Sequence, residues 1–478
     1  MNKRFVSAWK NRIPFIALCI FFATASAYLF RPPWFDEVLT LLWLKFPLSE
    51  IPFQYKIPNN HIVYTMTLSV WKSLLEPLDL FQLIPIRFLS VLTGGAVVWI
   101  LSKDLIRFCG FYAGGACALL FASSSTVANF STAFRGYILA LLLCFLAFRF
   151  ACRWGVRGRN RDLCLTLLFM FLGVGVMPSN LFLLESAAVL LIPNLWKARD
   201  REGFRFRFLT LFFAPPVLLL IFYLPILPLL WNASRLLEGW HSYAAAYANL
   251  YGAFVWMVLP VMIFAVFGTV SLWKRMPRFR WTILCALALF LLPAGLAVLT
   301  RVPPFPRIFF PLFGIWMILL AFPLGYWFRR DGKNRRIPVL VLTLFWLLAA
   351  PFFRDGVSCL YGGHHRDDLI LPAYATDAFQ PHTTAKKIAE MLPSDGMIFV
   401  DFDADPPSLT FQLPGRGVPE YRVLYDRPGL PKPDELEESD LIVCTGPDRL
   451  AALKKRFRLS GEYECILDGV SQKIYRRK

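Results

Sequence analysis

Two adjacent carboxylates, Asp36 and Glu37 in "RPPWFDEVLT", follow directly after an apolar stretch in a sequence of which only 17% of the residues are charged. A carboxylate at the end of a membrane helix can act as a general base that takes the proton from an acceptor hydroxyl. Neighbouring residues of a helix point about 100° apart, so the two side chains cannot face the same atom. We expect Asp36 to be the base, and Glu37 to hold an arginine or the acceptor.

Cationic side chains on the same predicted side of the membrane would complete such a site. Arginine makes planar, bidentate contacts to phosphate, and a lipid phosphate is a leaving group that needs cations rather than a general acid. Sugar transfer from a polyprenyl-phosphate carrier fits this combination, and a single base that acts opposite the leaving group would invert the anomeric centre. The candidates lie in the first outer loop or at outer helix ends: Lys56, His61, Arg87, Arg135, Arg301 and Arg307.

Several of these candidates also have a simpler explanation. Asp36 could cap a surface helix, with Glu37 in its first turn, because carboxylates are favourable at helix N-termini. Arg135 and Arg307 could anchor their helices at the lipid headgroups. His61 follows two asparagines and could be a turn or capping residue.

Membrane helices are the elements that must position these residues. The sequence is 57% hydrophobic, which is far above the average of soluble domains, and its mean hydropathy is +0.51. Crossing the hydrocarbon takes about 20 mainly apolar residues, and the chain is therefore predicted to be a polytopic α-helical membrane protein. The stretches of suitable length give about eleven spans, over 13–30, 84–102, 110–127, 136–151, 163–178, 181–195, 208–231, 251–273, 281–299, 308–328 and 337–353. The 163–195 stretch, broken at "MPSN", could instead be one re-entrant hairpin.

The distribution of basic residues predicts the orientation of the chain. The formal net charge is +19, but the basic clusters occupy the N-terminus and alternate loops, as in "RWGVRGRNR" and "KARDREGFRFR". This is the positive-inside pattern, and it argues against a nucleic-acid partner. We expect an inner-membrane protein with a cytoplasmic N-terminus, an extracytoplasmic C-terminal domain and a first helix that is not cleaved at the signal-like "ATASA".

Two segments that are predicted on the outer side of the membrane are long enough to contain secondary structure of their own. In the first outer loop, 31–83, "FDEVLTLLWLKF" and "HIVYTMTLSVWKSLL" predict short helices along the membrane surface. The tail alternates helix and strand patterns, which predicts a small α/β domain in which Cys444 and Cys465 could pair. The expected domains are therefore a transmembrane domain over 1–353 and a soluble α/β domain over 354–478.

Several segments together resemble one known family. "PPWFDE" after a first helix is similar to the acidic motif of the GT-C glycosyltransferases, most of all to the protein-mannosyltransferase and aminoarabinose-transferase branch. The resemblance continues through "PNNHIVYTMTLSVW", "IPIRFLSVLTGGAVVWILSKDL", "FSTAFRGYILALLLCFLAF" and, more weakly, "PRIFFPLF". It covers residues 30–150 well, and the remaining chain mainly by hydropathy and the α/β tail.

The resemblance implies roles for individual residues. It makes Asp36 the catalytic base, Glu37 its acidic neighbour and Arg135 a contact to the carrier phosphate, with Tyr137 in the same Arg-x-Tyr pattern. Arg307 is a weaker candidate for a phosphate contact. Where aminoarabinose transferases have a Glu-Lys-Pro-Pro string, this chain has "KIPNNH", so its Lys56 and His61 match only approximately. A lipid A acceptor therefore does not carry over to this chain.

The expected partners are membrane lipids, a polyprenyl-phosphate sugar donor and a glycan, lipid or protein acceptor. No cofactor is certain: a divalent metal stays open, since related enzymes differ in metal use, and "GGHHRDD" lacks the spacing of a known metal site. Two other functions also stay open. A transporter or flippase of a lipid-linked glycan would place polar groups near the bilayer midplane, where only Glu185 is expected. A membrane sensor or assembly subunit would use the outer domain to bind a ligand.

Overall fold

A computed structural model gives the fold of part of the chain. It describes residues 3–30, 33, 35–54, 61–78, 83–185, 188–189, 203–229, 380–401, 404, 406–419, 422–425, 439–469 and 472–478, and five isolated positions between 310 and 325. The predicted spans over 251–273, 281–299 and 337–353 lie outside these residues. The chain divides into two compact units, one of Met1–Phe30, Trp43–Gly363 and Asp368–Pro372, and one of Arg31–Leu42, His364–Asp367 and Ala373–Lys478.

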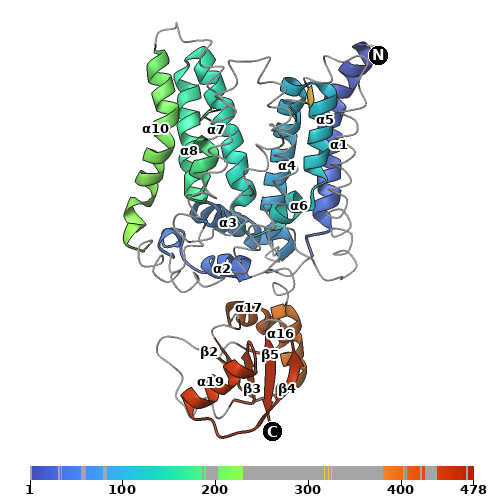
Figure 1. Cartoon of the computed structure of the whole chain (residues 1–478), viewed down its shortest axis with the longest axis vertical. Helices are drawn as coiled ribbons and strands as arrows, with labels where there is room; N and C mark the ends of the chain where they lie inside the picture. Colours follow the sequence, from blue (N-terminus) through green and yellow to red (C-terminus); the bar gives the residue numbers. More distant parts are fainter. Residues whose placement is uncertain are drawn as a thin grey trace. The chain divides into compact units, whose positions relative to one another are not determined.

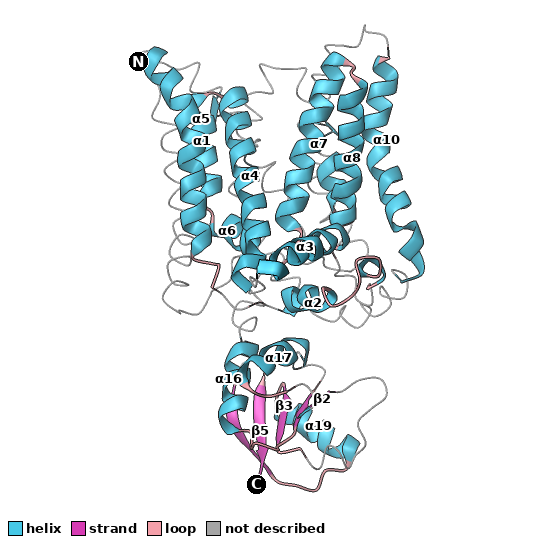
Figure 2. Cartoon of the chain, turned by 180° about the vertical axis from the view of Figure 1, so that it is seen from behind, coloured by secondary structure: helices cyan, strands magenta, loops and turns pink. Residues whose placement is uncertain are grey.

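The first unit is a bundle of helices that lie side by side (Figures 1 and 2). Within the described residues, three helical segments are long and apolar enough to cross a membrane: Ile84–Cys109, Tyr137–Gly155 and Phe204–Leu229. They confirm the spans predicted over 84–102, 136–151 and 208–231. The long helices are α1 (Lys3–Ser26), α4 (Leu83–Cys109), α7 (Tyr137–Arg157), α8 (Asn160–Val176) and α10 (Phe204–Tyr223, continued by a 3-10 turn at Leu224–Ile226).

The span predicted over 110–127 is wrong in its length. Two short helices stand there instead, α5 (Phe111–Ala122) and α6 (Ser125–Thr132), separated at Ser123 and Ser124. With 12 residues, α5 is shorter than a full crossing of the hydrocarbon requires. Serine side chains compete for backbone hydrogen bonds, and Ser123 Oγ donates to the Leu120 carbonyl at 3.2 Å. Hydropathy alone does not register this break, because its flanks are apolar.

The break predicted at "MPSN" is confirmed. Helix α8 ends at Val176, and a helix resumes at Asn180. The buried Asn180 side chain connects the helix that starts at residue 180 to α7 and α8. Its Nδ2 donates to the carbonyl of Gly173 in α8 at 3.0 Å and to that of Ala140 in α7 at 3.4 Å. A buried polar side chain is tolerated here because it is hydrogen-bonded.

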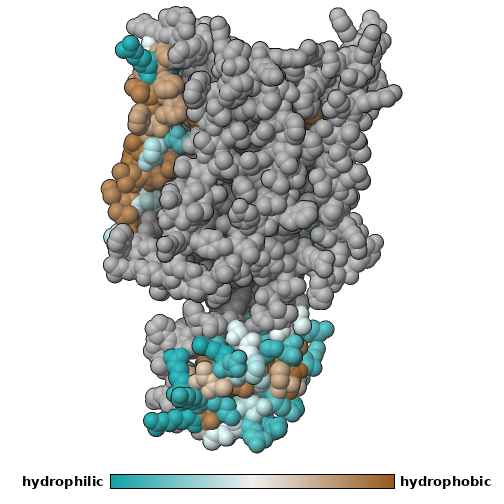
Figure 3. Space-filling model, in the orientation of Figure 1, coloured by the Kyte–Doolittle hydropathy of each residue, from teal (hydrophilic) through white to brown (hydrophobic). Residues whose placement is uncertain are grey.

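The polar ends of the helices fall into two groups. The start of α4, the helix α6 and the start of α7 lie at one end of the bundle, whereas the α7–α8 loop and the start of α10 lie at the other (Figures 1 and 2). The basic cluster 153–161 is therefore at the opposite end from Arg87 and Arg135, as alternating spans require. Figure 3 shows the apolar outer surface of α10, which is typical of a helix that faces lipid.

A shorter helix lies across one end of the bundle. Helix α3 (Ile62–Leu75) follows the short 3-10 turn Ile51–Phe53 and leads into another at Glu76–Leu78. It contacts α4 and α8 and runs across the axes of the long helices rather than along them (Figures 1 and 2). This is the orientation expected of the surface helix that the sequence predicts.

The second unit contains a five-stranded sheet with the order β2-β1-β3-β5-β4. β1, β2 and β3 are parallel, whereas β5 runs antiparallel to both β3 and β4. The strands are β1 (Ile398–Val400), β2 (Val423–Tyr425), β3 (Leu441–Cys444), β4 (Tyr463–Asp468) and β5 (Lys473–Arg477). Four of these strands lie in the segments that the sequence predicts as strands, "MIFVDF", "YRVLY", "DLIVCTG" and "EYECILDG", whereas β5 is not predicted. Helix α19 (Pro447–Phe457) coincides with the predicted helix "PDRLAALKKRF", and α16 (Gln380–Met391) overlaps the predicted helix "TTAKKIAEMLPSDG".

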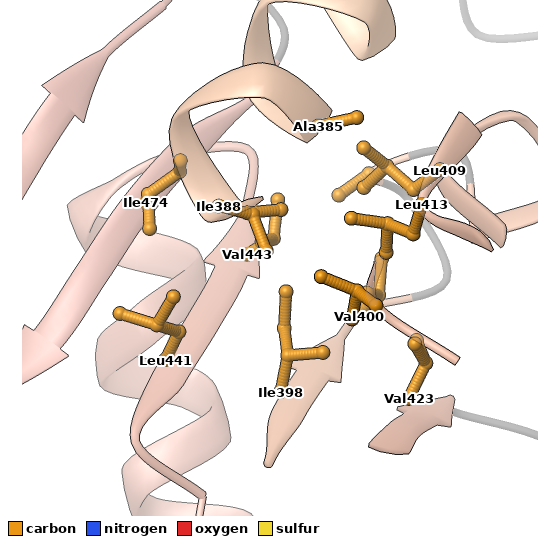
Figure 4. Close-up of a cluster of buried hydrophobic side chains, with 12 residues drawn as sticks. Ala385, Ile388, Ile398, Val400, Leu409, Leu413, Val423, Leu441, Val443 and Ile474 are labelled. Carbon is orange, nitrogen blue, oxygen red and sulfur yellow. The ribbon is translucent and has the colours of Figure 1, made fainter. Parts of the chain in front are cut away.

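Both faces of this sheet are covered by helices. On one face, α16 and the additional helix α17 (Pro406–Gln412) pack against alternate strand residues, among them Ile398, Val400, Leu441 and Val443 (Figure 4). On the other face, α19 packs against Phe399, Ile442, Cys444 and Tyr475. Arg449 of α19 also makes a bidentate ion pair with the buried Asp401, with both N–O distances at 2.8 Å. The alternation of faces explains why these strand segments read as continuous apolar runs.

The pairing of Cys444 with Cys465 is wrong. Cys444 is on β3 and Cys465 on β4, and β5 lies between these two strands. Neighbouring strands are about 4.8 Å apart, so the two cysteines are separated by roughly 10 Å, which is beyond the reach of a disulfide. Both cysteines are free thiols.

We therefore expect the two thiols to react differently with a maleimide. Cys465 is exposed, whereas Cys444 is buried, and burial raises the pKa of the Cys444 thiol to about 11, so little reactive thiolate forms at neutral pH. Peptide mass mapping of the native protein should show Cys465 labelled and Cys444 labelled only after unfolding. A peptide in which the two residues are cross-linked by a disulfide would contradict this arrangement of strands.

Candidate functional site

The carboxylate pair lies in the first turn of a short helix. Helix α2 spans Phe35–Trp43, the first nine residues of the predicted segment "FDEVLTLLWLKF". Both Asp36 and Glu37 are in its first turn, where the helix dipole favours negative charge. The Thr40 hydroxyl donates to the Asp36 carbonyl at 3.1 Å, inside the same helix. Only 4% of Asp36 and none of Glu37 is exposed, whereas a carboxylate that merely caps a surface helix would be solvated. Carboxylates are rarely buried in proteins, and two adjacent buried carboxylates mark this turn as a candidate site.

A second group of predicted residues surrounds the turn between α6 and α7. This turn, residues 133–136, carries Arg135, which is fully buried and has its guanidinium carbon 6.0 Å from the centre of the Tyr137 ring. Tyr137 is the first residue of α7 and packs edge-on against Phe130 of α6, with ring centres 5.0 Å apart. The Arg-x-Tyr pattern of the sequence is therefore an Arg in a turn beside the aromatic residue that starts the next helix.

His61 joins this turn from the start of α3. Its Nδ1 accepts a hydrogen bond from the Gly136 backbone N–H at 2.8 Å, and its ring stands edge-on to Tyr137 at 4.8 Å. His61 is the N-cap residue of α3, but its side chain makes no capping hydrogen bond to that helix. Its side chain instead satisfies a backbone donor at the start of another helix, α7.

Residue 136 must be glycine because the side chains of His61, Tyr64 and Val176 approach its backbone closely. A Cβ there would lie 2.9 Å from His61 Nδ1 and 3.0 Å from Tyr64 Cβ, and would overlap the Val176 side chain. The helices α3, α7 and α8 thus meet where Gly136 has no side chain.

Two hydroxyls hold the other end of the turn. The Ala133 carbonyl accepts hydrogen bonds from Ser90 Oγ at 2.8 Å and from Tyr64 Oη at 3.2 Å, and the two hydroxyl oxygens are 2.7 Å apart. Tyr64 belongs to α3 and Ser90 to α4. The backbone of the turn is therefore bonded at Ala133 and at Gly136 by side chains from two other helices.

Arg87 lies next to the same turn but has a different contact. It is fully buried in α4, where its Nη1 donates to the Leu29 carbonyl at 2.5 Å, just after α1. Its guanidinium carbon lies 4.9 Å from the centre of the Phe134 ring. Arg87 thus connects α1, α4 and the turn that carries Arg135.

The structure brings together His61, Arg87, Arg135 and Tyr137, which lie far apart in the sequence. Asp36 and Glu37 are on α2, in the other compact unit. Lys56, Arg301 and Arg307 lie outside the described residues, as does "GGHHRDD". Glu185 is half-buried on the helix that starts at Asn180. Among the described residues, no three His, Cys, Asp or Glu side chains are grouped as they would be to hold a metal ion.

Tyr64 and Ser90 were missed by the sequence reasoning. Each lies three residues after a predicted site residue, Tyr64 after His61 and Ser90 after Arg87. Residues three apart share one face of a helix, so this spacing is the signal that could have found them.

Comparison with known proteins gives similarity in fold. No protein-family model and no curated protein sequence matches this chain. Among solved structures, ArnT from Cupriavidus metallidurans in the apo state aligns with a TM-score of 0.50 and 13% identity, over 98% of each chain. The structure of the same protein bound to undecaprenyl phosphate aligns with a TM-score of 0.52 and 14% identity, again over 98% of each chain. At this level of identity, the comparison shows that the chain shares the fold of ArnT.

Proposed function

We propose that this chain, which shares the fold of ArnT, is an inverting glycosyltransferase that moves a sugar from a polyprenyl-phosphate carrier to an acceptor. The observation that carries the proposal is the fully buried Arg135, held in a turn at one end of a membrane bundle. Arginine forms planar, bidentate contacts with phosphate, so a carrier phosphate is a suitable ligand for this guanidinium. The fold shared with a protein that binds undecaprenyl phosphate supports the same assignment.

The proposed reaction is a single displacement. Asp36 takes the proton of the acceptor hydroxyl while that oxygen attacks the anomeric carbon of the donor. The bond between the anomeric carbon and the phosphate oxygen breaks, and its electron pair stays on the phosphate. Arg135 stabilises the charge that develops there, which is a contribution larger in the transition state than in the ground state. Because the acceptor enters opposite the leaving phosphate, the anomeric configuration inverts.

The other candidates have supporting roles in this proposal. Glu37 binds the acceptor or an arginine, and Tyr137 packs beside the guanidinium of Arg135. Arg87, Lys56 and Arg307 are proposed as further cations around the phosphate. A divalent metal stays open as an additional group at the carboxylates.

The proposed location is the outer face of the inner membrane. The charge of the loops supports a cytoplasmic N-terminus and an extracytoplasmic domain over 354–478. The lipid-linked donor would reach the site from the bilayer, and the glycan, lipid or protein acceptor from the aqueous side.

The test of this function is transfer of label by the purified protein. Full-length protein in lipid nanodiscs is incubated with radiolabelled polyprenyl-phosphate sugars and a total envelope extract, with and without EDTA. We expect label to move to a component of the extract only when the protein is present, and loss with EDTA would identify a metal requirement. Donor binding without transfer to any component would favour a transporter or flippase instead. Absence of both would favour a sensor.

A further inference from the structure

We infer that α3 and its N-cap residue position Arg135 together with Ser90 of α4: His61, Tyr64 and Ser90 fix the backbone of the Arg135 turn and thereby the direction of its guanidinium. This inference rests on the proposed function, in which Arg135 binds the carrier phosphate, and it adds positioning residues to that site. His61 then acts through the Gly136 backbone and not by contact with the substrate.

The hydrogen bond that His61 accepts defines the tautomer of its ring. Nδ1 accepts the Gly136 N–H at 2.8 Å, so this nitrogen carries no proton and the neutral ring is protonated on Nε2. Only 7% of His61 is exposed, so water cannot readily replace it as the acceptor for the Gly136 N–H. A buried N–H that loses its partner is unfavourable, and the turn would move to satisfy it.

The hydroxyl pair holds the turn redundantly. If Ser90 donates its one proton to the Ala133 carbonyl at 2.8 Å, Tyr64 donates to Ser90 Oγ at 2.7 Å. If Ser90 is removed, the Tyr64 hydroxyl is still 3.2 Å from the same carbonyl. The loss of one hydroxyl is therefore tolerated, and the loss of both leaves the buried Ala133 carbonyl without its donors.

The position of α3, in the loop after the first helix, is coupled to the Arg135 turn. Since His61 is the N-cap residue of α3 and Tyr64 lies within it, a displacement of this helix strains the hydrogen bonds at both ends of the turn. Binding of the carrier phosphate at Arg135 and the placement of α3 are thus coupled through hydrogen bonds that join residues 75 and 69 positions apart in the sequence.

A matched pair of substitutions separates the hydrogen bond of His61 from its ring. His61→Asn keeps an acceptor, because Oδ1 of Asn is as many bonds from Cα as Nδ1 of His, but it loses the ring contact to Tyr137. His61→Phe keeps the ring and loses the acceptor. Two quantities are measured in nanodiscs: hydrogen–deuterium exchange of the peptide that carries Gly136, and the Kd for undecaprenyl phosphate.

We expect His61→Phe to speed up exchange at this peptide and to weaken binding of undecaprenyl phosphate about tenfold, because the phosphate contact is no longer preorganised. His61→Asn should stay within about threefold of wild type in both. Unchanged exchange in a folded His61→Phe protein would overturn the inference, as would faster exchange with an unchanged Kd. If wild type itself binds no polyprenyl phosphate, the proposed function is wrong, and the exchange comparison alone decides whether α3 holds the turn.

The hydroxyl pair provides a second arm that does not depend on the folding of a His61 variant. Tyr64→Phe and Ser90→Ala should each change the Kd by less than about twofold, and the double variant by about tenfold, which exceeds the roughly fourfold product expected for independent sites. Additive effects, or no effect of the double variant, would contradict a shared role at the Ala133 carbonyl.

Discussion

Replacement of Asp36 by Asn is expected to lower the rate of sugar transfer by about 100- to 10,000-fold, the range that a positioned general base contributes. Asn keeps the size and shape of the side chain, but it cannot accept the proton of the acceptor hydroxyl. Because donor binding does not require this base, the Kd for the donor should stay close to that of wild type. The measurement is single-turnover transfer of label in nanodiscs, beside donor binding by the same preparation.

Two controls make this result specific to Asp36. Glu37→Gln removes the adjacent carboxylate, which points about 100° away, and it should lower the rate much less. Glu50→Gln neutralises an exposed acid of the same outer loop and should have no effect. Thermal unfolding of Asp36→Asn should match wild type, since a neutral amide is easier to bury than a carboxylate. Equal transfer by wild type and a folded Asp36→Asn protein would assign the base to another residue.

The second large effect is expected at Arg135. Arg135→Gln removes the charge that is proposed to stabilise the departing phosphate and should lower kcat/KM for the donor by about 30- to 1,000-fold, equivalent to about 2–4 kcal/mol. Arg135→Lys keeps the charge but cannot form the bidentate contact, and it should recover only part of the activity. The two variants together separate the contribution of charge from that of geometry.

Arg153→Gln is the matched control for Arg135→Gln. Arg153 is an exposed residue near the end of α7, at the opposite end of the same helix, and it stacks on Phe150 at 5.2 Å. Its loss changes the net charge equally and should leave donor kinetics unchanged. If both variants lose activity to the same extent, a general electrostatic effect on the lipid-linked donor would explain the result better than a phosphate contact at Arg135.

The described helices were largely predictable because hydropathy is a property of a single segment. The spans over 84–102, 136–151 and 208–231 correspond to α4, α7 and α10, and the helical period of "HIVYTMTLSVWKSLL" identified α3. The prediction of one span over 110–127 failed because two serines interrupt the helix there. A hydropathy average over the segment does not detect them, since the residues on both sides are apolar. In the sheet, the apolar runs identified β1 and β3, but strand order is not encoded in any one strand, and the pairing of Cys444 with Cys465 failed for that reason.

For the candidate site too, some features were predictable from single segments of the sequence, whereas others depend on the tertiary structure. The sequence by itself predicted that a carboxylate pair follows the first membrane helix, that His61 lies in the loop after it, and that Arg87 and Arg135 lie at helix ends on the same side of the bundle. These conclusions need only the order of apolar and charged residues along the chain, because the membrane imposes the rest. Tyr137 was a candidate only through the resemblance to the GT-C glycosyltransferases. Only the tertiary structure decided that Asp36 and Glu37 are buried, and that His61 bonds Gly136 while Tyr64 and Ser90 bond Ala133. Such contacts depend on how α3 packs across α4 and α8, and no periodicity within one helix specifies the hydrogen-bond partners it will meet on another element.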